Sequence, residues 1–245
     1  MKSLFRLICL FLIPITLIAA DKSGSLPTAD EIVTRMTALD LQRQSSFAGY
    51  EGMRRYVLEN ARLEKRAEML VHVQGDENGR KHFEVVSEQG WKAANTHVLR
   101  KMLDSESDTS RPELRATTKL NFTNYEFTVA GEELVVGRMA YVLEVAPKRK
   151  DKYLFQGRIW VDAEDYALVR AEGSPAKNPS FWTKSTHFVQ VYQKRGNLWF
   201  PLSTRSVTEA RIFGTTDVNI EYFDYAPKSR PSQDALLSVN EAYQP

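Results

Sequence analysis

The stretch YLFQGRIWVDAEDYALVRA, residues 153–171, decides the fold. Apolar side chains recur at every second position up to Val161, an acidic turn follows at residues 162–165, and the alternation resumes from Ala167 to Ala171. Period-two alternation on both sides of a tight turn is typical of a β-hairpin that has one apolar face.

The same alternation occupies most of the chain on either side of this hairpin. Met69, Val71 and Val73 share one face of an early strand, and Phe83 and Val85 face inward on the strand that returns. No segment of helical length separates successive late strands, so their pairing is antiparallel. We expect about nine to eleven strands in one meandering sheet.

Helical spacing is confined to two segments. Thr28-Ala-Asp-Glu31 resembles a capping box and opens a helix that we expect to reach about Gln44. A second helix is expected over about 96–107, and residues 105–112 are expected to form a mobile polar loop.

A comparison of sizes then predicts the architecture. Nine strands span about 43 Å, whereas two helices, each about 10 Å wide, cover about half of that width. The fold class is therefore α+β, mainly β: a curled antiparallel sheet, or open half-barrel, with helices plugging its concave face. Such a trough leaves an apolar cavity that suits a lipid or an acyl chain.

The N-terminal residues indicate the compartment of the protein. Lys2 and Arg6 precede a short apolar run that ends at Ala19-Ala20, which is typical of a cleaved signal peptide and too short for a membrane span, although an uncleaved anchor is the alternative. We expect a signal peptide at 1–20, a leader at 21–27, one domain at 28–225, a tail at 226–245, and a periplasmic protein. The single cysteine, Cys9, lies within the signal, so the mature chain has no disulfide.

Composition and motifs exclude several classes of function. Cleavage of the signal removes two of the 33 basic residues and leaves as many as the 31 acidic ones, so no general attraction to nucleic acid is expected. The chain lacks the GxSxG and HExxH motifs and a glycine-rich nucleotide loop. We therefore predict no enzyme activity, no metal and no cofactor; a hydrolase is the weakest hypothesis.

Two segments carry a family resemblance. Residues 137–148, GRMAYVLEVAPK, and residues 158–170, RIWVDAEDYALVR, resemble the glycine-turn strand and the strand–acidic turn–strand unit of LolA/LolB-like outer-membrane lipoprotein-sorting proteins, a superfamily that includes RseB-type sensors. The resemblance spans about 28–225. It implies a half-open barrel with helices as a lid, and periplasmic binding of a lipid or an acylated protein without a cofactor.

The residues expected to face inward on the strands, and the apolar residues on one side of each expected helix, are candidate ligand contacts. Residues expected to line the apolar cavity are Met36, Met69, Val71, Phe83, Val85, Leu99, Met102, Phe127, Leu143, Phe155 and Ile159. The alternative for each is an ordinary packed core. Trp160 has the opposite phase, so we expect it to pack on the outer face, or to contact a partner.

A basic turn and an aromatic loop are candidates for membrane or partner contact. They comprise Lys148, Arg149, Lys150 and Lys152, followed by Phe181 and Trp182. A solvated hairpin tip is the alternative for the basic residues, and a cavity-mouth flap or a core anchor for the aromatic ones.

The favoured function is that of a carrier or chaperone that shields acyl chains during lipoprotein sorting or lipid transfer. The alternative is an RseB-like, lipid-responsive sensor that regulates a membrane signalling protein. We expect a monomer whose partners are a lipid or an acylated lipoprotein and an inner- or outer-membrane protein.

Overall fold

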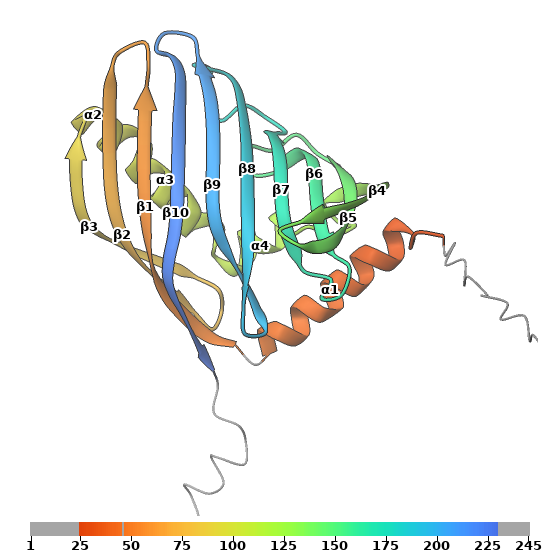
Figure 1. Ribbon diagram of the computed structural model, residues 1–245. Helices are drawn as coiled ribbons and strands as arrows, with labels where there is room; N and C mark the ends of the chain where they lie inside the picture. Colours follow the sequence, from red (N-terminus) through yellow and green to blue (C-terminus); the bar gives the residue numbers. More distant parts are fainter. Residues whose placement is uncertain (1–24, 46, 230–245) are drawn as a thin grey trace, which may run out of the picture.

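A computed structural model describes residues 25–45 and 47–229, and its strands form one curved sheet (Figure 1). The ten strands lie in the order β3-β2-β1-β10-β9-β8-β7-β6-β5-β4, and every neighbouring pair is antiparallel. Strands β3 and β4 are the two edges, so the sheet is open, as predicted. The strands are β1 (Phe47–Asn60), β2 (Lys65–Asp76), β3 (Lys81–Gly90), β4 (Tyr125–Val135), β5 (Arg138–Pro147), β6 (Phe155–Asp162), β7 (Leu168–Pro175), β8 (Thr183–Arg195), β9 (Leu198–Ala210) and β10 (Gly214–Ser229).

Helices precede the sheet and connect β3 to β4. They are α1 (Ala29–Ser45), α2 (Lys92–Ala94), the π-helical turn η1 (Asn95–Leu99), α3 (Arg100–Thr109) and α4 (Pro112–Thr118). The mobile loop expected at 105–112 is wrong, since α3 continues to Thr109 and α4 begins at Pro112. The expected signal peptide and most of the leader lie outside the described residues, as does the chain beyond Ser229.

The capping box predicted at the start of α1 is present. The backbone N–H of Thr28 donates to a Glu31 carboxylate oxygen at 2.7 Å, and the backbone N–H of Glu31 donates to the Thr28 hydroxyl at 3.3 Å. These bonds satisfy amide groups that have no partner within the helix. Ile32, Val33 and Met36 then form the buried stripe of α1.

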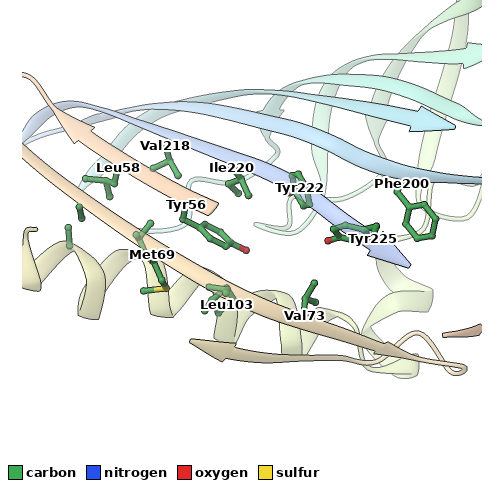
Figure 2. Close-up of a cluster of buried hydrophobic side chains, with 14 residues drawn as sticks. Tyr56, Leu58, Met69, Val73, Leu103, Phe200, Val218, Ile220, Tyr222 and Tyr225 are labelled. Atoms are coloured by element: carbon green, nitrogen blue, oxygen red, sulfur yellow. The ribbon is translucent and has the colours of Figure 1, made fainter. Parts of the chain in front are cut away.

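One face of the sheet carries two separate apolar clusters. Around β1, β2 and β10, residues such as Met69 and Val73 pack against Leu103 of α3 (Figure 2). Around β4 to β7, Leu143 and Ile159 pack against the buried stripe of α1.

The strand register places both clusters on the same face. Leu58 pairs with Val218, which pairs with Ser206, which in turn pairs with Phe188. Partners in an antiparallel pair point to the same side of the sheet, and Phe188 packs in the α1 cluster whereas Leu58 packs in the α3 cluster. The stretch of β8 and β9 between the clusters therefore forms the floor of a trough.

Close backbone approach helps the sheet to curl where β6 meets β7. Gly157 and Gly173 are direct cross-strand partners, and a Cβ atom on Gly157 would lie 2.1 Å from the Glu172 carbonyl oxygen. Glycine pairs of this kind allow a bend that side chains would block. The hairpin at residues 153–171 is therefore a strand pair, β6 and β7, as predicted, and the sheet also bends there.

Candidate functional site

A cavity of about 720 Å³ lies on the inner face between the C-terminal half of α1 and the strands of the trough. Its walls come from the starts of β1, β7 and β9, from the ends of β8 and β10, and from residues 119–121 ahead of β4, together with Lys81 and Glu106. Pockets that bind small molecules typically measure about 300–1,000 Å³, so this cavity is large enough for a ligand.

Aromatic rings form one wall of the cavity. The rings of Tyr50 and Tyr225 stack with centroids 5.4 Å apart, and the Phe200 ring lies 5.4 Å from Tyr225 and 5.9 Å from Tyr50. Because Phe200 and Tyr225 are buried against their neighbours, this wall is already packed and offers a firm apolar surface.

Helix α1 provides the cover of the cavity. Met36 is buried, whereas Leu41, five residues further along the helix, lines the cavity and is 55% exposed. An exposed leucine on a concave surface gains free energy when an apolar ligand covers it. The helix is held at Tyr166, where the Arg35 guanidinium lies 4.8 Å from the ring centroid and donates to the hydroxyl at 3.3 Å. Arg43 also donates to the backbone carbonyl of Asp165.

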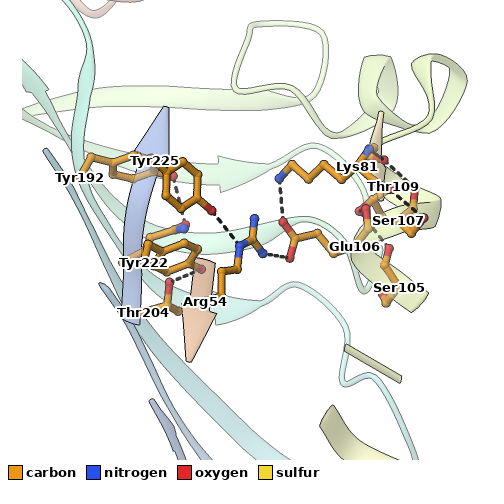
Figure 3. Close-up of polar contacts among 12 residues, drawn as sticks. Arg54, Lys81, Ser105, Glu106, Ser107, Thr109, Tyr192, Thr204, Tyr222 and Tyr225 are labelled. Atoms are coloured by element: carbon orange, nitrogen blue, oxygen red, sulfur yellow. Dashed lines mark hydrogen bonds and ion pairs between the residues drawn. The ribbon is translucent and has the colours of Figure 1, made fainter. Parts of the chain in front are cut away.

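A charged trio, Arg54, Lys81 and Glu106, adjoins the aromatic wall at Tyr225 (Figure 3). Arg54 is 1% exposed, and its guanidinium donates to the Glu106 carboxylate at 2.7 Å and to the Tyr225 hydroxyl at 2.9 Å. Lys81 donates to the other Glu106 oxygen at 2.6 Å. The Arg54 guanidinium also lies 4.9 Å from the Tyr222 ring centroid. Buried charges persist only when they are paired in this way.

Charge balance within the trio determines its ionisation. Burial by itself would raise the pKa of Glu106, but Lys81 and Arg54 outweigh it and lower that pKa to about 2. Burial raises the pKa of Tyr225 to about 12, despite the neighbouring Arg54. At neutral pH the trio thus holds two cations and one anion next to a neutral tyrosine.

The residues predicted to line the cavity belong to the two packed apolar clusters. Met69, Val71, Phe83, Val85, Leu99 and Met102 belong to the cluster beside α3, while Met36, Phe127, Leu143, Phe155 and Ile159 belong to the cluster beside α1. All of them pack on the inner face, and Met36 lines the cavity. The cavity lies between the clusters, at the α1 end of the trough.

Sequence reasoning missed the residues that form most of the cavity wall. Arg54 has the same phase as Tyr56 and Leu58 in β1, so a charged side chain at an inward position was a signal for a polar site. Tyr192, Phe200 and Tyr225 lie far from Arg54 in the sequence, and no local pattern brings them together.

The predicted contact residues lie at the other end of the strands. Phe181 and Trp182 are 74% and 55% exposed and are absent from the cavity lining, so they are neither a flap at its mouth nor a core anchor. Lys148, Arg149, Lys150 and Lys152 are exposed in the β5–β6 connection. Trp160 packs on the outer face, as expected from its phase, and donates to the Glu133 carboxylate at 2.7 Å.

Among residues 25–45 and 47–229, no group of three or more histidine, cysteine or acidic side chains is arranged to hold a metal ion. No helix in the same ranges is long and apolar enough to cross a membrane.

Comparisons with known proteins agree with the predicted resemblance. Residues 94–178 match the MucB/RseB N-terminal domain family, and this match includes both segments, 137–148 and 158–170, that carry the resemblance. The resemblance is thereby confirmed over this part of the chain. No curated protein sequence matches the chain.

Several solved structures are similar. A DUF1329 family protein from Desulfovibrio piger is 14% identical, with 88% of this chain and 98% of that chain covered and a TM-score of 0.43. A LolA superfamily protein from Nitrosomonas europaea is 13% identical, with 85% and 97% covered and a TM-score of 0.37. The Pseudomonas aeruginosa MucA/MucB complex contains a chain that is 10% identical, with 82% and 99% covered and a TM-score of 0.27.

Proposed function

We propose that this protein binds the acyl chains of a lipid or an acylated protein in the cavity beneath α1, as a periplasmic carrier or chaperone for lipoprotein sorting or lipid transfer. The observation that carries the proposal is the 720 Å³ cavity with aromatic and aliphatic walls on the inner face of an open sheet. The role requires binding and release, without catalysis.

The cavity walls suit an amphiphile better than a purely apolar molecule. Leu41, Phe200 and Tyr225 offer apolar surface, whereas Lys81 and Glu106 place charge at the same cavity. Burial of apolar surface yields about 25 cal/mol per Å² before the costs of association. A tail against the aromatic wall and a polar group near the trio would use both kinds of surface.

A regulatory sensor is the second candidate, and one observation favours it. The family match at residues 94–178 is to the MucB/RseB N-terminal domain, and MucB has been solved in complex with MucA. In this role the same cavity would detect a stray lipid, and occupancy would change the affinity for a membrane signalling protein.

The decisive experiment measures lipid in the purified protein. We expect native mass spectrometry and organic extraction to find a bound lipid in the wild type. Leu41→Glu should lower its retention at least about fivefold, because covering the exposed half of a leucine is worth about 1 kcal/mol and a buried carboxylate adds a further penalty.

The matched control is Leu134→Glu, which introduces the same charge at a leucine that is 64% exposed and outside the cavity lining. Both variants change solvent-exposed positions, so both should fold. Equal lipid retention in the two variants, or a wild type without lipid, would refute acyl binding at this cavity.

Carrier and sensor differ in what the loaded protein does next. A carrier transfers its lipid to acceptor vesicles. A sensor instead binds the periplasmic segment of a membrane protein with an affinity that changes on lipid loading. Measuring both with wild type and Leu41→Glu separates the two roles.

A further inference from the structure

Four connections between strands lie side by side at the end of the sheet opposite α1. They are residues 61–64, 211–213, 176–182 and 148–154, and we call them together the basic edge. Figure 1 shows the β1–β2 and β9–β10 connections at the top of the sheet and α1 at its lower end.

Hydrogen bonds join these connections into a continuous surface. Arg62 donates to the Ile212 carbonyl at 3.1 Å, and the Arg211 amide donates to the Trp182 carbonyl at 2.9 Å. The Ala176 amide donates to the Leu154 carbonyl at 2.8 Å. The basic edge is therefore one built surface.

Apolar side chains project from the middle of this surface. Phe181 is 74% exposed, Trp182 55%, Ile212 53% and Phe213 49%. The Phe181 and Trp182 rings contact each other edge to face, with centroids 5.3 Å apart, and the Arg211 guanidinium lies 5.0 Å from the Phe181 ring centroid. Adjacent exposed aromatic groups of this kind usually mark a contact with another surface.

Positive charge surrounds the apolar centre. The basic edge contains seven basic and two acidic residues: Arg62, Lys148, Arg149, Lys150, Lys152, Lys177 and Arg211, with Glu64 and Asp151. The connections at the other end, residues 77–80, 136–137, 163–167 and 196–197, contain one basic and three acidic residues. Within the described chain, Lys150 and Lys177 have no ion-pair partner. The charge of this nearly neutral protein is thus polarised along its strands.

We propose that the basic edge docks the protein on an anionic lipid bilayer. Aromatic side chains favour the interfacial layer of a membrane, where an apolar ring and a polar group can both be accommodated. Basic residues beside them gain about fivefold in binding per residue on an anionic surface. Phe181, Trp182, Ile212 and Phe213 enter the interfacial layer, and the lysines of residues 148–152 contact the head groups.

The aromatic centre of the basic edge is remote from the aromatic wall of the cavity, whereas Lys148 and Arg149 donate to Phe122 and Asn124, near the lining residue Asn121. Trp182 precedes β8, whereas Tyr192 lines the cavity near the end of the same strand. At about 3.3 Å per residue the two positions lie about 30 Å apart. The docking proposal therefore stands or falls independently of acyl binding.

Vesicle flotation tests the proposal with two types of vesicle: phosphatidylcholine alone, and phosphatidylcholine mixed with phosphatidylglycerol. We expect the purified protein to float with the anionic vesicles and to be released as salt rises from about 0.1 M to about 1 M. Lys150→Ala with Lys152→Ala should weaken binding about 25-fold. Phe181→Ser with Trp182→Ser should weaken it about tenfold.

Matched control variants change the same chemistry at the other end of the sheet. Arg80→Ala with Arg195→Ala removes two exposed cations, and Leu134→Ser with Val136→Ser removes two exposed apolar side chains. Both controls should bind anionic vesicles within about twofold of the wild type. Leu41→Glu should also bind them normally, whether or not it retains lipid.

The proposal is overturned if the protein binds the two vesicle types equally or binds neither. It is also overturned if a control pair weakens binding as much as its matched pair on the basic edge. All substituted side chains are exposed, so circular dichroism and the thermal midpoint should match those of the wild type in every variant.

Discussion

Glu106→Gln tests the charged trio at the cavity wall, because it removes one charge and keeps the shape of the side chain. In the wild type this carboxylate balances Arg54 at 2.7 Å and Lys81 at 2.6 Å. The variant leaves the Arg54 guanidinium, 1% exposed, without a counter-charge. Breaking a buried ion pair costs about 3–5 kcal/mol, and the partial exposure of Glu106, 32%, places the expected loss near 2–3 kcal/mol.

The pH dependence supplies a second, independent readout. The ordinary pKa of a glutamate is 4.5, and the pKa of Glu106 is lowered to about 2 in the folded protein by Lys81 and Arg54 against the effect of burial. A lowered folded-state pKa stabilises the protein above pH 4.5, and this contribution is lost as pH falls from 4.5 towards 2. The stability difference between wild type and Glu106→Gln should therefore be constant from about pH 7 to about pH 5 and shrink below that.

Urea unfolding, followed by tryptophan fluorescence at several pH values, measures both effects. The control is Glu209→Gln, since Glu209 pairs with Lys184 at 2.9 Å with both side chains about half exposed. That variant should lose less than about 0.5 kcal/mol. If Glu106→Gln costs no more than the control, or if its cost persists unchanged at pH 2, the trio does not act as a buried ion network.

Three other substitutions probe the fold. In urea unfolding, Gly157→Ala should lower the free energy of unfolding by several kcal/mol more than Gly131→Ala. The two glycines have similar φ angles, 155° and 149°, but only a Cβ at Gly157 would meet backbone, at 2.1 Å. Equal losses would show that close approach is not the cause. Trp160→Phe should cost about 1–2 kcal/mol, because the Glu133 carboxylate loses a 2.7 Å hydrogen bond. A matching loss in Glu133→Met, which removes the acceptor, would tie the effect to that bond. Val136→Asn should raise the midpoint of thermal unfolding, because Val136 has a φ of 50° and asparagine tolerates the left-handed backbone region better than valine does. An unchanged or lower midpoint would contradict this.

The β-sheet could be predicted because its pattern is local. Alternation at Met69, Val71 and Val73 identifies a strand and the face that it buries, and the structure keeps these residues on the inner face. The helical end of α3 was not predictable in the same way. Its polar residues, including Glu106 and Ser107, are held by bonds to Lys81, a residue of another element.

The cavity was only partly predictable, since phase determines the face of a strand and not the position along it. Leu143 and Ile159 face inward as predicted, but α1 packs directly on them and fills the space. The cavity opens further along the trough, where α1 extends past its packed stripe and Leu41 is 55% exposed. The length and direction of a helix over a sheet depend on tertiary packing, which no period in the sequence reports.

The arrangement of the two sites constrains how the proposed functions operate. If the basic edge rests on a bilayer through Phe181 and Trp182, β8 places Tyr192 at the cavity wall about 30 Å away from it. The α1 end of the cavity then lies away from that bilayer, so a carrier would receive lipid there from another protein or before docking. A sensor has no such difficulty, because the α1 end of its cavity then faces the solution, from which a stray lipid arrives. Lipid loading from anionic vesicles separates these cases. Lys150→Ala with Lys152→Ala should increase this uptake in a carrier that must undock, and should leave it unchanged in a sensor. Uptake from a soluble donor is the control and should not change in either case.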